Sequence, residues 1–506
     1  MRRRLETIRK LSQAAFLLLF GLLFLLTVYP PSGRPVDLFL RTDPLAAGSA
    51  LLAARHFPWD RLLWLLPLVG LALVAGRAFC GWICPLGTLV DCADGLARRR
   101  RPLALPGPRR AKYYLLAALL AAALLGAQLA YLADPLVLLT RSFALGLFAP
   151  LQAVARAVGL GNHPLLPESQ AYYRFSLLAL VMLGAILGLA VVGRRYWCRM
   201  LCPLGALYGL LGRWAPVRLQ VNDQCVECGR CARECPTGAI SAQDPRRYQG
   251  AECTLCAHCL RACPTQAIGI NLGHYPGREP GADLSRRRLL AAVGVGAVWV
   301  AGVKAAASQK PTVTGVRAGS PWLIRPPGAL AEEEFLRRCL RCQQCVKACP
   351  TNGLQPALAE GGLDGLWTPV LVPRLGACTE HCNLCSQVCP TGAIAPFAID
   401  EKPHLFLGTA KIDRSHCLVW AQERECLVCD EVCAYRAIEW RQDGGKGRPY
   451  VIDEICTGCG LCESACPIQP RAAIRVYNTG DKRHWSRERQ RQWRLTGRRR
   501  DAGPSQ

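Results

Sequence analysis

The chain carries 29 cysteines among its 506 residues, and most of them stand in short runs of four. Two runs near the middle have the spacing C-x2-C-x2-C-x3-C-P, and Thr-x-Ala-Ile follows both. Three thiolates at this spacing can wrap three irons of a cubane cluster. A disulfide scaffold would be small and loop-rich, and a zinc ribbon would not need two complete runs. The runs are Cys225, Cys228, Cys231 and Cys235, and then Cys253, Cys256, Cys259 and Cys263.

In two-cluster bacterial ferredoxins the fourth cysteine of each run ligates the other cluster. We therefore expect one [4Fe-4S] cluster on Cys225, Cys228, Cys231 and Cys263. The second cluster is expected on Cys253, Cys256, Cys259 and Cys235.

Four more runs follow in the last third of the chain. The second of them has a longer first gap, and the third has a first gap of eight residues and no following proline. Together the runs predict six [4Fe-4S] clusters, but the spacing leaves open whether the first run exchanges its fourth cysteine with the second or the fourth run. The four runs are Cys339, Cys342, Cys345 and Cys349; Cys378, Cys382, Cys385 and Cys389; Cys417, Cys426, Cys429 and Cys433; and Cys456, Cys459, Cys462 and Cys466.

Apolar stretches predict a membrane domain, because a spanning helix needs about 20 mostly apolar residues. Four stretches lie near residues 14–28, 62–74, 113–132 and 175–192, and a fifth covers 289–307. The net charge of +26 could suggest nucleic acid. The arginine clusters flank apolar stretches, however, where the positive-inside rule explains them, so we expect no nucleic-acid partner.

The same rule predicts an orientation and a domain order. The N-terminus and the segments after the second and fourth stretches are expected in the cytoplasm, and loops 30–60 and 134–172 outside. The expected fold class is a membrane α-helical domain, with four spans plus a fifth, joined to α+β bacterial ferredoxin-like domains. The expected divisions are a four-helix membrane domain (1–214), a two-cluster cytoplasmic ferredoxin domain (215–284), a fifth span or export signal (285–310), a linker (311–334), a four-cluster ferredoxin domain (335–476) and a basic tail (477–506).

The segment Ser285-Arg-Arg-Arg-Leu-Leu290 resembles the twin-arginine export motif, and a plain span with basic flanks is the alternative. Clusters are inserted in the cytoplasm, so a segment holding four of them would have to cross the membrane folded. This favours export. Residues 215–284 are then cytoplasmic and 311–506 periplasmic. A third arrangement, with the fifth stretch buried and every cluster cytoplasmic, stays open.

A second cysteine motif, C-x3-C-P, occurs twice, at Cys80 and Cys84 and again at Cys198 and Cys202. Each copy follows an even-numbered apolar stretch, which indicates two similar two-helix units. The four cysteines could converge on an additional metal, act as redox-active dithiols, or be small buried residues near a turn. Cys92 has no partner by spacing, and we expect it to be buried.

Some motifs are missing from the sequence. It contains no Cys-x-x-Cys-His for a covalent haem and no phosphate-binding glycine loop after a strand. We therefore expect a protein that moves electrons rather than one that makes bonds in a soluble substrate.

Residues 1–284, with their paired C-x3-C-P motifs and two-cluster ferredoxin, resemble the NapH and MauN membrane proteins, and share that module with NosR and CcoG. Residues 285–476 resemble NapG and MauM, through Trp322-Leu-Ile-Arg-Pro-Pro-Gly-Ala-Leu330, Glu334-Phe-Leu and the four runs. The resemblance implies a NapH–NapG fusion, the quinol-oxidising component of a periplasmic nitrate reductase type system. Its expected partners are the membrane quinol pool and a periplasmic reductase or c-type cytochrome. The resemblance to CcoG implies an alternative, a copper reductase or maturation factor with Cys80, Cys84, Cys198 and Cys202 as metal contacts.

Overall fold

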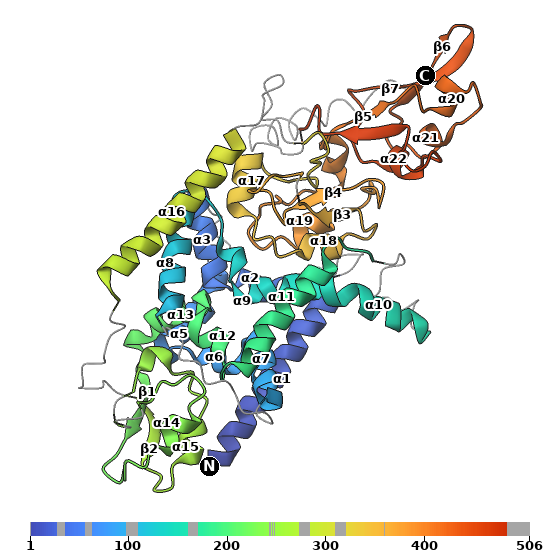
Figure 1. The fold of residues 1–506 in the computed structure, drawn as a ribbon. Helices are drawn as coiled ribbons and strands as arrows, with labels where there is room; N and C mark the ends of the chain where they lie inside the picture. Colours follow the sequence, from blue (N-terminus) through green and yellow to red (C-terminus); the bar gives the residue numbers. More distant parts are fainter. Residues whose placement is uncertain are drawn as a thin grey trace.

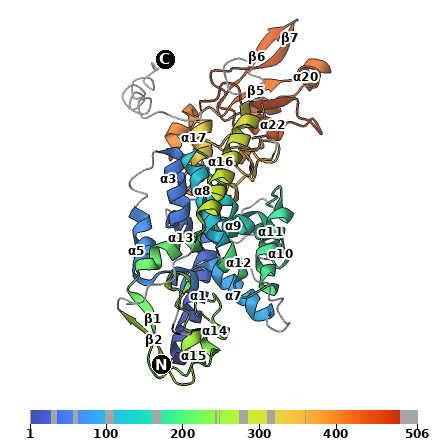
Figure 2. The ribbon, with the colours of Figure 1, turned by 60° about the vertical axis from the view of Figure 1, so that its left-hand side comes forward.

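The computed structural model describes residues 2–27, 36–55, 63–97, 110–159, 171–272 (apart from 242, 243, 245 and 247), 284–308 and 320–482 (apart from 359). The molecule is elongated, and its parts follow one another along the long axis (Figures 1 and 2). A small ferredoxin body with strands β1 and β2 lies at one end, beside the N-terminus. A layer of helices lies in the middle, and two further ferredoxin bodies occupy the other end.

The helical layer is built from short and long apolar helices. α1 starts against the first ferredoxin body and runs through the layer to its far side (Figure 1). The helices are α1 (Arg2–Leu25), α2 (Leu38–Arg41), α3 (Pro44–Ala54), α5 (Leu66–Ala75), α6 (Ala78–Trp82), α7 (Pro85–Ala97), α8 (Ala111–Leu124), α9 (Pro135–Arg141), α10 (Phe148–Ala157), α11 (Ser176–Gly188), α12 (Tyr196–Met200), α13 (Pro203–Leu211) and α16 (Arg286–Ser308), with short helices η1 to η5 at their junctions.

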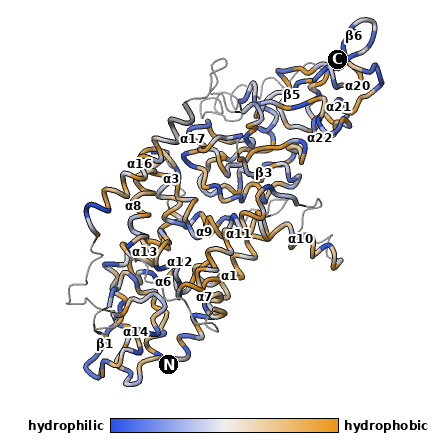
Figure 3. Tube along the Cα trace, viewed as in Figure 1, coloured by the Kyte–Doolittle hydropathy of each residue, from blue (hydrophilic) through white to orange (hydrophobic). Residues whose placement is uncertain are grey.

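Two helices of the described part are long and apolar enough to cross a membrane, Arg4–Leu25 and Pro135–Ala157. The predicted stretches at 62–74, 113–132 and 175–192 form shorter apolar helices, Leu63–Ala75, Ala111–Leu124 and Ser176–Val191. Large apolar side chains point outward from this layer; Leu18, Leu177 and Val298 are all more than 70% exposed. Figure 3 shows the apolar colouring concentrated on these helices.

The helix Pro135–Ala157 lies where the sequence analysis expected an outward loop. Asp134 caps it by accepting from the backbone N–H groups of Leu136 (2.9 Å) and Val137 (3.2 Å), and Pro135 starts it. A π-helical turn, η3 (Ser142–Leu147), joins α9 to α10. Arg141 and Pro150 interrupt the apolar pattern of this segment, which is why periodicity did not reveal a helix.

The first ferredoxin body is a pair of similar half-units. β1 (Val217–Val221) pairs antiparallel with β2 (Ile268–Leu272), and the helices α14 (Arg230–Glu234) and α15 (His258–Ala262) pack on each other. In each run the first two cysteines precede the helix and the third lies in its first turn, so the run wraps the helix N-terminus. The fourth cysteine follows directly after the last residue of the helix.

The last part of the chain forms two more bodies of the same kind. The nearer body contains α17 (Glu332–Arg338), α18 (Gln344–Ala348) and α19 (Leu384–Gln387), with β3 (Leu354–Pro356) antiparallel to β4 (Pro369–Leu371). The outer body has β5 (Thr409–Ile412) paired with β8 (Ile474–Tyr477), β6 (Ile438–Asp443) paired with β7 (Lys446–Val451), and helices α20 (Leu418–Ala421), α21 (Val428–Glu431) and α22 (Leu461–Ala465).

Residues 320–334, which the sequence analysis assigned to a linker, pack against the nearer body. Arg325 is fully buried there and bonds to Glu332, Thr368 Oγ1 (2.7 Å) and the Pro369 carbonyl (2.8 Å). The Pro- and Gly-rich composition concealed this packing, because one buried arginine with three acceptors fixes the segment. Residues 309–319 and the basic tail from 483 onward lie outside the described residues.

Candidate iron–sulfur sites and the buried cysteine pairs

In the first ferredoxin body, cysteines from the two runs lie together. Cys225, Cys228, Cys231 and Cys263 line one hollow between the two half-units. Burial raises the pKa of the thiols of Cys253, Cys256 and Cys259, and the Cys235 sulfur lies close enough to add to the rise in each. Each of these sets therefore combines three cysteines of one run with the fourth cysteine of the other.

The hollows of the last two bodies distinguish between the pairings that the spacing left open. The first hollow is lined by Cys339, Cys342, Cys345 and Cys389, so the first run takes its fourth cysteine from the second. In the outer body one hollow is lined by Cys433, Cys456, Cys459 and Cys462, and the other by Cys417, Cys426, Cys429 and Cys466. The third and fourth runs therefore exchange their fourth cysteines with each other.

The remaining set is Cys349, Cys378, Cys382 and Cys385. Burial raises the pKa of the last three thiols, and the Cys349 sulfur is near enough to raise each further. The irregular first gaps at Cys378 and Cys417 thus do not prevent either run from contributing three cysteines to a four-cysteine set.

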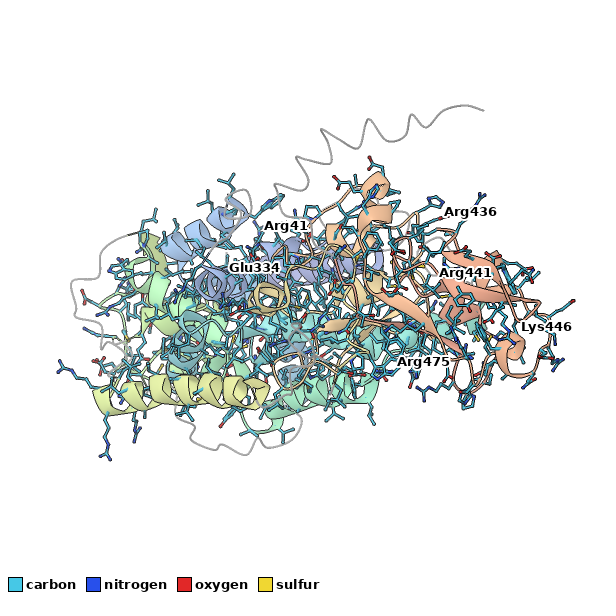
Figure 4. The ribbon with its side chains drawn as sticks, turned by 90° about the horizontal axis from the view of Figure 1, so that it is seen from above. Arg41, Glu334, Arg436, Arg441, Lys446 and Arg475 are labelled. Atoms are coloured by element: carbon cyan, nitrogen blue, oxygen red, sulfur yellow. The ribbon has the colours of Figure 1, made fainter. Side chains whose placement is uncertain are left out.

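The four sets of the last two bodies form a series that leads away from the helices. The set with Cys339 and Cys342 adjoins the helical layer, since Cys342 packs in the same apolar cluster as residues of α9 and α13. Between the bodies, the N–H of Cys378 donates to the carbonyl of Cys459 at 2.8 Å. The set with Cys417 lies at the far tip, in a body that also carries Arg436, Arg441, Lys446 and Arg475 (Figure 4).

The two C-x3-C-P motifs meet inside the helical layer, and all four of their cysteines are buried. Arg77, before the first motif, donates to the Cys198 carbonyl at 3.0 Å, and Arg195, before the second, donates to the Cys80 carbonyl at 3.0 Å. Cys84 and Cys202 each accept an N–H bond on sulfur at 3.3 Å, from Gly87 and Gly205. The two repeats are therefore related by an approximate twofold exchange of identical contacts.

The surroundings of the four cysteines bear on whether they could bind a metal. Within the residues that the structure describes, no group of three or more His, Cys, Asp or Glu side chains is placed to bind one metal ion. The sulfurs are in a buried site with backbone N–H donors and two buried arginines, Arg77 and Arg195. The N–H bonds and the positive charge favour a negative sulfur, but burial outweighs them and raises the pKa of the Cys84, Cys198 and Cys202 thiols.

The first ferredoxin body docks directly onto the C-x3-C-P helices. A Cβ atom on Gly81 of α6 would stand 2.4 Å from the Thr254 carbonyl oxygen, so the loop after Cys253 approaches where only glycine leaves room. The Trp82 indole N–H also donates to the Leu255 carbonyl at 3.2 Å. The cysteine pairs and the set with Cys253 therefore lie on the two sides of one contact.

Glu252 is the ionic centre of this contact. Its carboxylate accepts from Arg77 Nη1 at 2.6 Å, from the Tyr113 hydroxyl at 2.9 Å and from Lys112 Nζ. Burial alone would raise the pKa of Glu252, but Arg77 and Lys112 outweigh burial and hold the pKa below its usual value. One carboxylate thus pairs with two fully buried cations from the helical layer.

Asp91 of α7 has the matching role for the other arginine. It receives two bonds of 2.6 Å from Arg195, one of 3.0 Å from Arg9 and one of 2.8 Å from Gln13. Burial would raise the pKa of Asp91, but these donors, Arg195 foremost, hold it well below its ordinary value. The ion pairs Arg77–Glu252 and Arg195–Asp91 therefore hold in place the two arginines that contact the C-x3-C-P motifs.

A second repeat, which the sequence analysis missed, places two buried aspartates together. Asp43-Pro-Leu and Asp134-Pro-Leu start α3 and α9, and each aspartate caps its helix with one oxygen. Both carboxyls are fully buried and interact electrostatically, and the second oxygen of each, Asp43 Oδ2 and Asp134 Oδ2, has no hydrogen-bond donor within the described residues. The two copies lie at different chain distances from the C-x3-C-P motif that follows each of them. Only the tripeptide Asp-Pro-Leu therefore signals this repeat in the sequence.

Cys92 corrects one expectation. It was expected to be buried, but it is exposed on α7, because its position on the helix faces away from the side that carries Asp91 and Asp94 inward.

Comparisons with known proteins agree with these sites. A family described as "4Fe-4S binding domain" matches residues 57–104 and 175–222, which contain the two C-x3-C-P motifs. A family described as "4Fe-4S dicluster domain" matches 224–267 and 424–469. The methylamine utilization ferredoxin-type protein MauM of Methylorubrum extorquens is 40% identical over 162 residues, which are 30% of this chain and 71% of MauM. The ferredoxin-type protein NapG of Escherichia coli is 36% identical over 208 residues, 38% of this chain and 84% of NapG.

The chain belongs to the NapG/MauM family of ferredoxin-type proteins.

A further relative of this NapG/MauM-type protein is the ferredoxin-type protein NapF of Escherichia coli, 32% identical over 168 residues, 33% of this chain and 93% of NapF. No solved structure matches it. The family and the matched domains make the chain an iron–sulfur electron-transfer protein with 4Fe-4S domains.

Proposed function

We propose that the chain is a membrane-bound component that passes electrons from the quinol pool to a periplasmic reductase of the nitrate reductase type, or to its c-type cytochrome. The observation that carries this proposal is the series of four-cysteine sets that starts at the apolar helical layer and ends at an outer tip. In a series of this kind an electron received at the helices is delivered far from them.

Six [4Fe-4S] clusters are part of the proposal. Two would occupy the body with Cys225 and Cys253, on the cytoplasmic side, and four the last two bodies, on the periplasmic side. Each set joins three cysteines of one run to a fourth from another run, which is the ligand pattern of two-cluster ferredoxins. Bound clusters would supply the one-electron chemistry, and the chain's own residues set their surroundings.

The placement of the clusters on both sides of a membrane rests on the helical layer. We infer that its apolar helices form the NapH-like four-span part and that α16 is a fifth span. α16 has 23 residues, about 34 Å at 1.5 Å per residue, which is enough to cross the hydrocarbon core. It packs along α8, where a Cβ on Gly296 would stand 2.5 Å from the Ala118 carbonyl oxygen. So close a backbone contact favours a retained span over a cleaved signal.

The test is anaerobic reduction of the purified, cluster-loaded protein. Menaquinol or ubiquinol should reduce the clusters, seen as bleaching of the iron–sulfur absorbance and the appearance of electron paramagnetic resonance signals. Protein that holds its iron and stays oxidised with both quinols would contradict the proposal.

A metal reductase or maturation factor is a second candidate, because the four buried cysteines Cys80, Cys84, Cys198 and Cys202 lie against the first ferredoxin body. In that case serine at these positions should abolish reduction of Cu(II) and leave the iron of the ferredoxin bodies unchanged. If the serine variants lose quinol oxidation and the wild-type protein reduces no Cu(II), this alternative is ruled out.

A further inference from the structure

A pocket of about 250 Å³ lies where the helical layer meets the first of the two outer ferredoxin bodies. The ends of α1, α2 and α9 form most of its wall, and Gln344 at the start of α18 closes one side. The pocket is open on another side. That volume is all the space between the walls, including the open side, so the proposed occupant is at most a single ring whose tail stays outside.

Aromatic rings form the apolar part of the wall. The rings of Phe20 and Phe39 meet edge to face with centroids 5.6 Å apart, and Phe24 stacks on Phe20 at 6.4 Å. All three residues line the pocket and are at most 7% exposed. Flat rings with this packing favour a flat aromatic ligand, which can stack or meet them edge to face.

Two polar oxygens in the wall have no hydrogen-bond donor within the described parts of the chain. They are Asp37 Oδ1 and Gln344 Oε1, on side chains that are 2% and 3% exposed. The other Asp37 oxygen accepts from Arg41 Nη2 at 2.8 Å, and the Gln344 amide nitrogen reaches the Val36 carbonyl at 3.5 Å. Buried acceptors are normally paired, so two in one pocket indicate a ligand that carries donors.

The pocket also adjoins a candidate cluster. Gln344 stands between Cys342 and Cys345 in the chain, and Val36 and Cys345 pack against the same small apolar cluster. Burial, and to a smaller degree the Asp37 carboxylate, raises the pKa of the Cys342 thiol, which shows that the pocket wall and this cysteine set are neighbours. An electron given up in the pocket would have almost no distance to travel to the first set of the outer series.

We propose that this pocket binds the head group of a membrane quinol, with its hydroxyl groups donating to Asp37 Oδ1 and Gln344 Oε1 and its ring held by Phe20, Phe24 and Phe39. This inference rests on the proposed quinol oxidation and assigns it a site. When the quinol becomes quinone its two O–H bonds break. A 4Fe-4S cluster held by Cys339, Cys342, Cys345 and Cys389 would accept the two electrons in turn. The two protons leave in turn to Asp37 and then to water through the open side.

The first experiment measures binding of a fluorescent quinol-site inhibitor of the hydroxyquinoline N-oxide class to the cluster-loaded protein in detergent. Gln344→Leu and Asp37→Leu should each weaken binding by about tenfold or more, because each removes one buried acceptor for the ligand. Gln387→Leu is the control for the first, since it makes the same change on an exposed side chain in the next cysteine run. Arg41→Leu is the control for the second, because it removes the same ion pair without lining the pocket.

The second experiment labels the wild-type protein with a photoreactive azidoquinone, and it decides the matter even where a variant loses iron. Label on peptides containing Phe20, Phe24 or Phe39 is expected. If quinol reduces the wild-type clusters but the label lies elsewhere, or Gln344→Leu and Asp37→Leu bind the inhibitor like their controls, this site is wrong and the proposed function stands. If the wild-type protein neither binds the inhibitor nor accepts electrons from quinol, the proposed function fails together with the site.

Discussion

Replacing Glu252 with glutamine should loosen the first ferredoxin body from the helical layer. Glu252 is the only carboxylate that the structure pairs with Arg77 and Lys112 among the described residues, and both cations are fully buried. Glutamine keeps the shape and one acceptor oxygen but removes the charge. Removing one partner of a buried ion pair costs about 3–5 kcal/mol, because the remaining charge stays buried and uncompensated.

That cost appears as easier opening of the docked contact, which amide hydrogen exchange measures locally. At about 1.4 kcal/mol per factor of ten, exchange in residues 251–255 and in α6 should accelerate by roughly two to three and a half orders of magnitude. The α22 segment of the outer body should exchange at its wild-type rate, because it lies at the other end of the molecule.

Glu227→Gln supplies the matched control on the same ferredoxin body. Glu227 pairs with Arg246 at 3.8 Å, and both side chains are about half exposed or more. Such a pair is worth about 0–1 kcal/mol, so exchange should change by less than roughly fivefold. If Glu252→Gln and Glu227→Gln give the same exchange in residues 251–255, the buried ion cluster does not hold the body in place and the reasoning is refuted.

Three further changes test other contacts. Gly81→Ala should destabilise the same docking by about 1–3 kcal/mol through overpacking, whereas Gly95→Ala, with nothing near its Cβ, should leave the melting temperature unchanged; equal melting curves would contradict the close approach. Asp43→Asn should fold, because its amide oxygen keeps the α3 cap and its amide nitrogen can donate to the Asp134 oxygen that has no donor, whereas Asp43→Leu should lose about 1–3 kcal/mol with the cap; thermal unfolding in detergent distinguishes them, and equal stability of both variants would contradict this reasoning. Cys466→Ser should remove the resonance signal of the outermost cluster and spare the cluster of its own run's first three cysteines; the reverse result would exclude the exchanged pairing.

The sequence predicted most about features that repeat in it. Spacing alone brought together Cys225, Cys228, Cys231 and Cys263, because ferredoxin runs exchange their fourth cysteine by a fixed local geometry. It could not choose between partners for Cys349 and Cys389, since that depends on which bodies form and how they pack. The C-x3-C-P repeat likewise predicted two similar units, and the exchanged bonds of Arg77 and Arg195 agree with them.

Features that depend on one long-range contact were missed. Nothing in the sequence marks Glu252 as different from the exposed Glu227, because its partners come from chain segments more than 100 residues away. The packing of residues 320–334 depends on Arg325 in the same way. The pocket between α1, α2 and α18 escaped notice for a related reason: Phe20, Asp37 and Gln344 belong to three segments, and only the folded chain joins them.

Helix α16 also changes how tightly the outer ferredoxin bodies need to bind the helical layer. Because it joins the two parts in one chain, each helical layer has its own pair of outer bodies nearby, at an effective concentration in the millimolar range expected for short tethers. A contact too weak to hold two separate proteins together is then enough to keep the pocket beside the neighbouring cysteines. The interface combines apolar packing with polar contacts, in which Arg341 and Lys347 donate to backbone carbonyls of the layer. Covalent continuity also fixes a one-to-one ratio, so every helical layer has its own pair of outer ferredoxin bodies.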